Sequence, residues 1–177
     1  MLKLFVLLVG LLLGFDAFST LRNGFEAYGD LMQFFAAFLA FFFLINKDLL
    51  AFLQILLSAF IALGLAHTSK AFFEYLATTE YAKLAHVSMR PNQEDFDGFP
   101  SGHSTASFIA AGFICKKYGF RLGIFAIVIA GLVAISRLYV ERHTILQVVC
   151  GSLLGFFVAY FIADSKLFRR FASRLTS

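Results

Sequence analysis

Charged residues are scarce in this chain of 177 residues, because Asp, Glu, Lys and Arg together make up only 15% of it. The net charge is a modest +4 and no basic block is interleaved with polar sequence, so we expect no nucleic-acid partner. Cysteine is also rare. Cys115 and Cys150 both fall within predicted apolar helices, so we expect neither a disulfide nor a metal bound by them. Repeats of solenoid length are missing as well.

Apolar residues dominate the composition instead. Hydrophobic residues account for 60% of the chain, 25 of them Phe, and the mean hydropathy is +0.81, which lies far outside the range of soluble proteins. The apolar residues form long runs instead of alternating with polar ones, a pattern typical of membrane helices and not of a β-barrel. The length suits about six spans of roughly 20 residues each. We therefore predict an all-α integral membrane protein, with residues 1–177 forming one six-transmembrane-helix bundle.

The predicted spans follow the apolar runs. They cover residues 1–19, 31–45, 49–68, 101–115, 122–138 and 143–163. The first run also resembles a secretory signal, but we interpret it as a span because the rest of the chain is membrane-embedded. Residues 20–30 are expected to form a short polar connection. The long polar segment at residues 69–99 is expected to continue the third helix and then to form an interfacial helix that Pro91 ends.

Positive charges in the short loops predict the orientation. With six crossings, Lys3, Lys47, the turn at residues 116–121 and the C-terminal tail share one side, which the positive-inside rule makes cytoplasmic. Both termini then lie in the cytoplasm. The opposite face receives segment 69–99, the start of the fourth span and the junction of the last two spans. One layer therefore contains Lys83, Arg90, His103, Arg137 and His143.

A helix start lies where the polar segment meets the fourth span. Pro100 fixes its own φ, and the side chain of Ser101 can accept hydrogen bonds from the first-turn N–H groups. Gly102 has no Cβ and lets the backbone approach a ligand closely. The bare N–H groups and the positive end of the helix dipole favour an anion at this point. His103 lies in the same first turn.

Three short motifs follow one another in this layer. Six residues separate Lys83 from Arg90-Pro91, Pro100-Ser101-Gly102-His103 comes next, and five residues separate Ser136-Arg137 from His143. This order and spacing resemble the tripartite signature of the type 2 phosphatidic acid phosphatase superfamily. The superfamily has an aspartate four residues after the last histidine, where this chain has Gln147.

The resemblance implies a metal-independent hydrolysis of a phosphate ester through a phosphohistidine, without a cofactor. His143 would attack phosphorus, and His103 would protonate the leaving oxygen and later take a proton from water. The remaining site residues would bind the phosphoryl oxygens. They are Arg90, Ser101, Gly102, Arg137 and a lysine.

Two assignments stay open. Lys83 has the superfamily spacing and is narrowly preferred, while Lys70 lies near the outer end of the third span and can alternatively pair with Glu74 at i,i+4. Gln147 lies one turn after His143 and can accept from its ring N–H, but an amide cannot stabilise imidazolium as a carboxylate does. We therefore expect a slower nucleophile or a substitute acid, for which Glu141 and Asp97 are the candidates.

A narrower resemblance concerns the substrate. The small size, segment 66–70, and segment 141–145 without a following aspartate look most like bacterial lipid A 1-phosphatases. This implies removal of the 1-phosphate of lipid A, a phosphorylated membrane lipid, at the periplasmic face of the inner membrane. Undecaprenyl diphosphate phosphatase and phosphatidylglycerophosphate or phosphatidate phosphatase are the alternatives. A non-catalytic phospholipid-binding or transport protein is the alternative of another class.

Overall fold

The computed structural model describes residues 15–91 and 95–163, with side chains from residue 21 onward. Within these residues the chain is helical and forms no β-strand, which confirms the predicted all-helical class. The elements in chain order are α2 (Phe15–Met32), α3 (Phe35–Ile45), α4 (Leu49–Ala77), α5 (Ala82–Ala85), the 3-10 helix η1 (His86–Ser88), α6 (Gly102–Tyr118), α7 (Phe120–Tyr139) and α8 (Ile145–Ala163).

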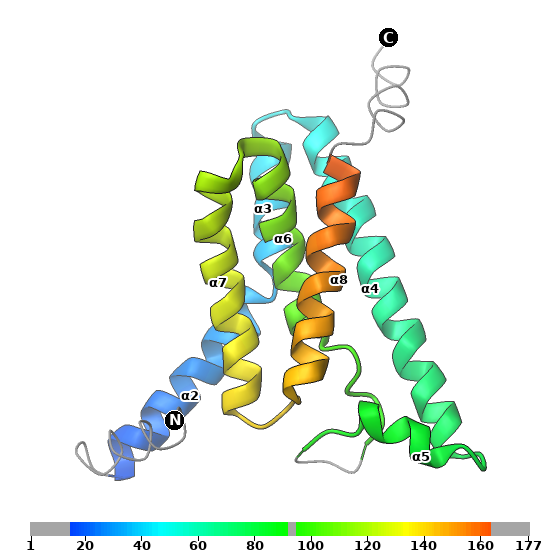
Figure 1. Ribbon diagram of the computed structural model, residues 1–177. Coiled ribbons are helices and arrows are strands. Elements are labelled where there is room, and N and C mark those ends of the chain that lie inside the picture. Colours follow the sequence, from blue (N-terminus) through cyan, green and yellow to red (C-terminus); the bar gives the residue numbers. More distant parts are fainter. Residues whose placement is uncertain (1–14, 92–94, 164–177) are drawn as a thin grey trace.

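Helix α6 lies at the centre of the bundle and packs against α3, α4, α7 and α8 (Figure 1). Glycines bring α6 and α8 close together. A Cβ on Gly112 of α6 would overlap the backbone of Phe156, and a Cβ on Gly155 of α8 would overlap the backbone of Thr105. Small residues at such positions allow two membrane helices to approach closely. The short α6–α8 distance holds the start of α6 beside the start of α8.

The number of membrane spans differs from the prediction. Among the described residues, α4, α7 and α8 are the three helices long and apolar enough to cross a membrane, and residues 21–45 add a fourth only if the 44° bend between α2 and α3 lies within one span. Six spans are therefore not confirmed. The first predicted span lies mostly outside the described residues. Helix α6 coincides with the fourth predicted span but has only 17 residues and buries Ser104, Thr105 and Ser107.

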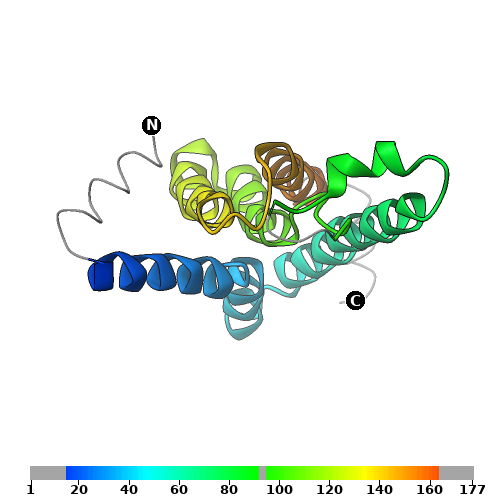
Figure 2. The ribbon, with the colours of Figure 1, turned by 90° about the horizontal axis from the view of Figure 1, so that it is seen from below.

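The polar connection predicted at residues 20–30 is wrong, because these residues belong to α2. Arg22, Glu26 and Asp30 repeat every four residues and therefore share one side of a helix. Tyr28 donates from its hydroxyl to the carbonyl of Ile129 at 3.0 Å, which fixes α2 against α7. The helix slants away from the bundle, as Figures 1 and 2 show. It is an amphipathic helix with polar groups near the end of the bundle that carries the α7–α8 connection.

The first part of the polar segment at residues 69–99 continues the third predicted span, as expected, because α4 extends to Ala77. The expected interfacial helix is present only as the short α5 and η1. Ser88 then fixes the return of the chain: its hydroxyl donates to the Phe96 carbonyl at 2.6 Å and accepts from the Phe99 N–H at 2.9 Å. The segment thus ends at the start of α6, near the α7–α8 connection (Figure 2).

Candidate active site

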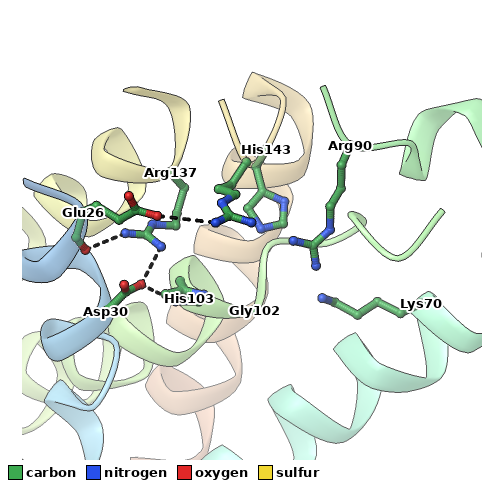
Figure 3. A pocket seen from close by; sticks show the side chains of 9 residues that line it. Glu26, Asp30, Lys70, Arg90, Gly102, His103, Arg137 and His143 are labelled. Carbon is green, nitrogen blue, oxygen red and sulfur yellow. Dashed lines mark hydrogen bonds and ion pairs between the residues drawn. The ribbon is translucent and has the colours of Figure 1, made fainter. Parts of the chain in front are cut away.

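A polar cavity of about 320 Å³ opens where α6 begins and α7 joins α8. Figure 3 shows the side chains that surround it. They come from α2, α4, the segment before α6, α6 itself, α7 and the α7–α8 connection. The lining residues are Glu26, Asp30, Lys70, Arg90, Gly102, His103, Arg137, Arg142 and His143. The three motifs, which are far apart in the sequence, therefore meet in one cavity, as the predicted layer requires.

Gln147 determines which nitrogen of His143 carries the proton. Its Nε2 lies 3.0 Å from the Val87 carbonyl and 2.9 Å from the Met89 carbonyl, so this atom must be the amide nitrogen. Its Oε1 therefore accepts hydrogen bonds, from the Thr144 N–H and from Nδ1 of His143, both at 3.1 Å. The proton of neutral His143 is then on Nδ1. The lone pair of Nε2 remains available to an electrophile.

His143 is held in the neutral form. Its side chain is buried, and this burial lowers the pKa of His143 to about 4, with the positive charges of Arg90 and Lys70 acting in the same direction. The hydrogen bond with Gln147 opposes the shift and is outweighed. A neutral imidazole with a free Nε2 is a competent nucleophile at neutral pH.

Arg90 is oriented by Asp97 in a two-point ion pair. Its Nε lies 2.5 Å from one carboxylate oxygen and its Nη2 lies 2.7 Å from the other. Burial alone would raise the pKa of Asp97, but the hydrogen bonds and charge of Arg90 outweigh it and lower the pKa of that carboxyl. Asp97 is thus engaged with Arg90. Glu141, the other candidate for a substitute acid, lies in the α7–α8 connection and does not line the cavity.

The lysine at the cavity is Lys70, and the preference for Lys83 is not supported. Lys70 lines the cavity from α4, and its Nζ would lie 4.0 Å from a Cβ built on Gly102. Lys83 lies exposed on α5 and is not part of the cavity wall. The reason is the length of α4: it reaches past the start of α6, so that a residue on its outer turns faces the cavity.

Ser101 does not occupy the position expected for a phosphate ligand. Its side chain is fully buried, and the hydroxyl accepts from Ser104 Oγ at 3.2 Å instead of capping the first turn of α6. Its backbone N–H donates to the Gln147 carbonyl at 2.9 Å. Ser101 therefore joins α6 to α8 beneath the cavity, whereas Gly102 and His103 face it.

Sequence reasoning missed the contribution of α2. Arg137 is 3% exposed and donates from Nη1 to Asp30 Oδ1 at 2.7 Å and from Nη2 to the Glu26 carbonyl at 2.9 Å. Nε2 of His103 lies 3.2 Å from the same Asp30 oxygen, and Arg142 pairs with the Glu26 carboxylate at 3.6 Å. The four-residue repeat of charges from Arg22 to Asp30 was the available signal.

An apolar groove adjoins the polar cavity. It has a volume of about 320 Å³, lies between α3, α4 and α6, and shares Gly102 and His103 with the polar cavity. Most of its wall is aliphatic or aromatic, including Phe34, Ile55 and Leu63. The two spaces together match a molecule with an anionic head and an apolar tail.

The next question is whether side chains in the part of the chain that the structure describes could bind a metal ion. There, no group of three or more His, Cys, Asp or Glu side chains is placed to hold a metal ion. Metal independence remains a prediction. The cations that would neutralise a phosphoryl group are instead side chains: Lys70, Arg90 and Arg137.

Comparisons with known proteins identify the family. The family model described as the PAP2 superfamily matches residues 52–170. A lipid A 4′-phosphatase from Helicobacter pylori is 31% identical over 135 residues, which are 76% of this chain and 67% of that protein. A lipid A 1-phosphatase from Helicobacter pylori is 26% identical over 124 residues, 70% of this chain and 63% of that protein, which is less than two thirds of its length.

Among solved structures, a transmembrane PAP2 type phosphatidylglycerolphosphate phosphatase from Bacillus subtilis is 21% identical. The alignment covers 98% of this chain and 95% of that one, with a TM-score of 0.41, too low to support a detailed comparison. The family assignment depends instead on the matched model, which spans more than half of the chain. With its three motifs gathered around one cation-lined cavity, the chain belongs to the PAP2 superfamily and is a membrane-embedded hydrolase of phosphoric esters.

Proposed function

We propose that this protein is a lipid phosphatase that works through a phosphohistidine at His143. The observation that carries the proposal is the bond from Nδ1 of His143 to Gln147 Oε1, because it leaves Nε2 as the nucleophilic nitrogen of a ring in the cavity wall. His103, from the first turn of α6, lines the same cavity. A nucleophile and a proton donor thus share one space with three cations.

The reaction divides into two displacements. In the first, Nε2 of His143 bonds to phosphorus while the ester P–O bond breaks and protonated His103 gives its proton to the leaving oxygen. In the second, His103 takes a proton from water, whose oxygen attacks phosphorus as the P–N bond breaks. Lys70, Arg90 and Arg137 stabilise the phosphoryl oxygens in both steps. Inorganic phosphate leaves, and both histidines return to their starting protonation states.

The proposed substrate is a phosphate group of lipid A. The apolar groove beside the cavity favours a substrate with hydrocarbon chains, and the two Helicobacter pylori relatives named above are lipid A phosphatases. Because these relatives include both a 4′- and a 1-phosphatase, either phosphate of lipid A is a candidate, and the 1-phosphate is the one that the sequence resemblance favours. We place the reaction at the periplasmic face of a bacterial inner membrane, with both termini in the cytoplasm.

A side-by-side assay tests this function. Purified protein in detergent with a chelator is given lipid A, undecaprenyl diphosphate, phosphatidylglycerophosphate and phosphatidate, and released phosphate is measured. We expect release from lipid A, lost in His143→Ala and retained in His86→Gln, since His86 is an exposed histidine outside the cavity. Faster release from another of these lipids would reassign the substrate. No release from any of them would favour a binding or transport protein.

A further inference from the structure

Helix α2 brings a carboxylate to the cavity from outside the matched family region, which begins at residue 52. We propose that Asp30 is a positioning residue, which favours the protonated form of His103 and orients this ring as the proton donor, and which is itself held in place by Arg137. This inference depends on the proposed function, in which His103 protonates the leaving oxygen. Asp30 would then be a site residue that lies outside the three motifs.

A single carboxylate oxygen joins the two groups. Oδ1 of Asp30 accepts from Nη1 of Arg137 at 2.7 Å and lies 3.2 Å from Nε2 of His103. Arg137 is almost fully buried, so its charge needs a fixed counter-charge. Figure 3 shows Asp30 between the two side chains at the edge of the cavity. Arg137, which the Glu26 carbonyl also holds, therefore fixes the carboxylate against His103 before a phosphate arrives.

The position of Asp30 is built into the packing of α2. Gly29 is buried against α7, where a Cβ would overlap Ser136 Oγ and the guanidinium of Arg137. Phe25 packs edge-on against Tyr139 with ring centroids 5.7 Å apart. Because glycine at position 29 lets α2 approach α7 so closely, the next residue reaches the site. The contact is thus made between two packed helices and not by a surface loop.

The surroundings of His103 explain why its protonated form needs this acid. Burial is the largest influence and lowers the pKa of His103, and the positive charges of Arg137 and Lys70 act in the same direction. Asp30 is the group that opposes this shift, and it offsets the shift only in part. Arg90 and Glu26 also line the cavity, and neutral His143 is the remaining titratable ring. The superfamily places an aspartate beside the nucleophilic histidine, and this chain has Gln147 there. In this site the carboxylate of Asp30 instead contacts the proton donor, His103. Asp30 is half-exposed, so solvent screens its charge in part.

The test compares two esters that differ in their need for an acid. Dodecyl phosphate must release an alkoxide, which requires protonation, whereas p-nitrophenyl phosphate releases a phenolate that leaves unprotonated. We expect Asp30→Asn to lower kcat for dodecyl phosphate by about 100-fold and kcat for p-nitrophenyl phosphate by less than about 5-fold. Asp30→Glu should recover part of the loss. Glu80→Gln, which removes an exposed acid outside the cavity, should change neither.

Each outcome decides something. A wild-type protein that cleaves neither ester, or forms no phosphohistidine, contradicts the proposed function itself. Formation of the phosphohistidine together with equal losses on both esters, or with no loss, overturns the role of Asp30 alone. The rate with p-nitrophenyl phosphate reports whether a variant is folded. If Asp30→Asn is inactive on both esters because it unfolds, the ratio of the two rates in Asp30→Glu takes its place, and an unchanged ratio overturns the inference.

Discussion

Gln147 and His143 form the contact on which the nucleophile depends: the amide oxygen accepts from Nδ1 of the ring at 3.1 Å, while the amide nitrogen donates to the carbonyls of Val87 and Met89. The amide thus serves the ring and the polar segment at once. A carboxylate at this place would bind the ring more strongly but would have no proton for the two carbonyls. The backbone carbonyls of Val87 and Met89 therefore suit the glutamine at position 147, where the superfamily has an aspartate.

Gln147→Glu tests this match directly. The substitution preserves the acceptor for His143 but places a charge against two carbonyl oxygens, so we expect lower thermal stability by about 1–3 kcal/mol and slower phosphate release. Thermal unfolding in detergent and initial rates check both parts. A glutamate variant that is as stable as the wild type and faster would show that the contacts with Val87 and Met89 are unimportant.

The protonation of His143 is a second prediction. Since burial lowers its pKa to about 4, the ring should remain neutral, with its proton on Nδ1, as the pH falls from 7 to 5. An ordinary histidine would become largely protonated over that range. Nitrogen NMR of protein labelled in its histidines, with His143→Ala to assign the signal, measures both the tautomer and the titration. A His143 ring that protonates near pH 6.5 would contradict the account.

The two lysines give a third prediction. Lys70→Met removes a cation from the cavity wall and should slow phosphate release by about 100-fold. Lys83→Met removes an exposed cation of the same polar segment and should change the rate by less than about 2-fold. Initial rates with the same lipid phosphate compare them. The opposite ranking would restore the assignment based on motif spacing.

The packing of α2 gives a fourth prediction, for which the chain supplies its own control. Gly29→Ala would force a methyl group into Ser136 and Arg137, so we expect a loss of about 1–3 kcal/mol in stability and a marked loss of activity. Gly24→Ala lies on the same helix with nothing within 4 Å of the added methyl, and should be neutral or slightly stabilising. Thermal unfolding and rates separate the two. Equal behaviour of both variants would mean that α2 does not hold the site.

The helical class could be predicted from the sequence because hydropathy is a local property. The convergence of the motifs could be predicted because counting membrane crossings places all three on the same face. The three motifs carry His103, Arg90, Arg137 and His143, and all four line the cavity. The roles of these residues remain predictions. Charge counting failed at residues 20–30, where a helix with a repeat of four was interpreted as a loop because its mean hydropathy is low.

The remaining differences depend on tertiary structure. The choice between Lys70 and Lys83 depends on how far α4 extends relative to the start of α6, which spacing along the chain does not encode. Ser101 was expected to face an anion, but the close approach of α6 and α8 buries it. The partner of Arg137 could not be found from the motifs, since Asp30 lies 107 residues away in the sequence.

The most direct test is to trap the covalent intermediate. Protein turning over p-nitrophenyl phosphate in chelator is quenched in base, which preserves a phosphorus–nitrogen bond, and its peptides are analysed by mass spectrometry. We predict an acid-labile phosphate on His143, absent from His143→Ala. Turnover without any phosphate on His143, or with phosphate on another residue, would contradict the account.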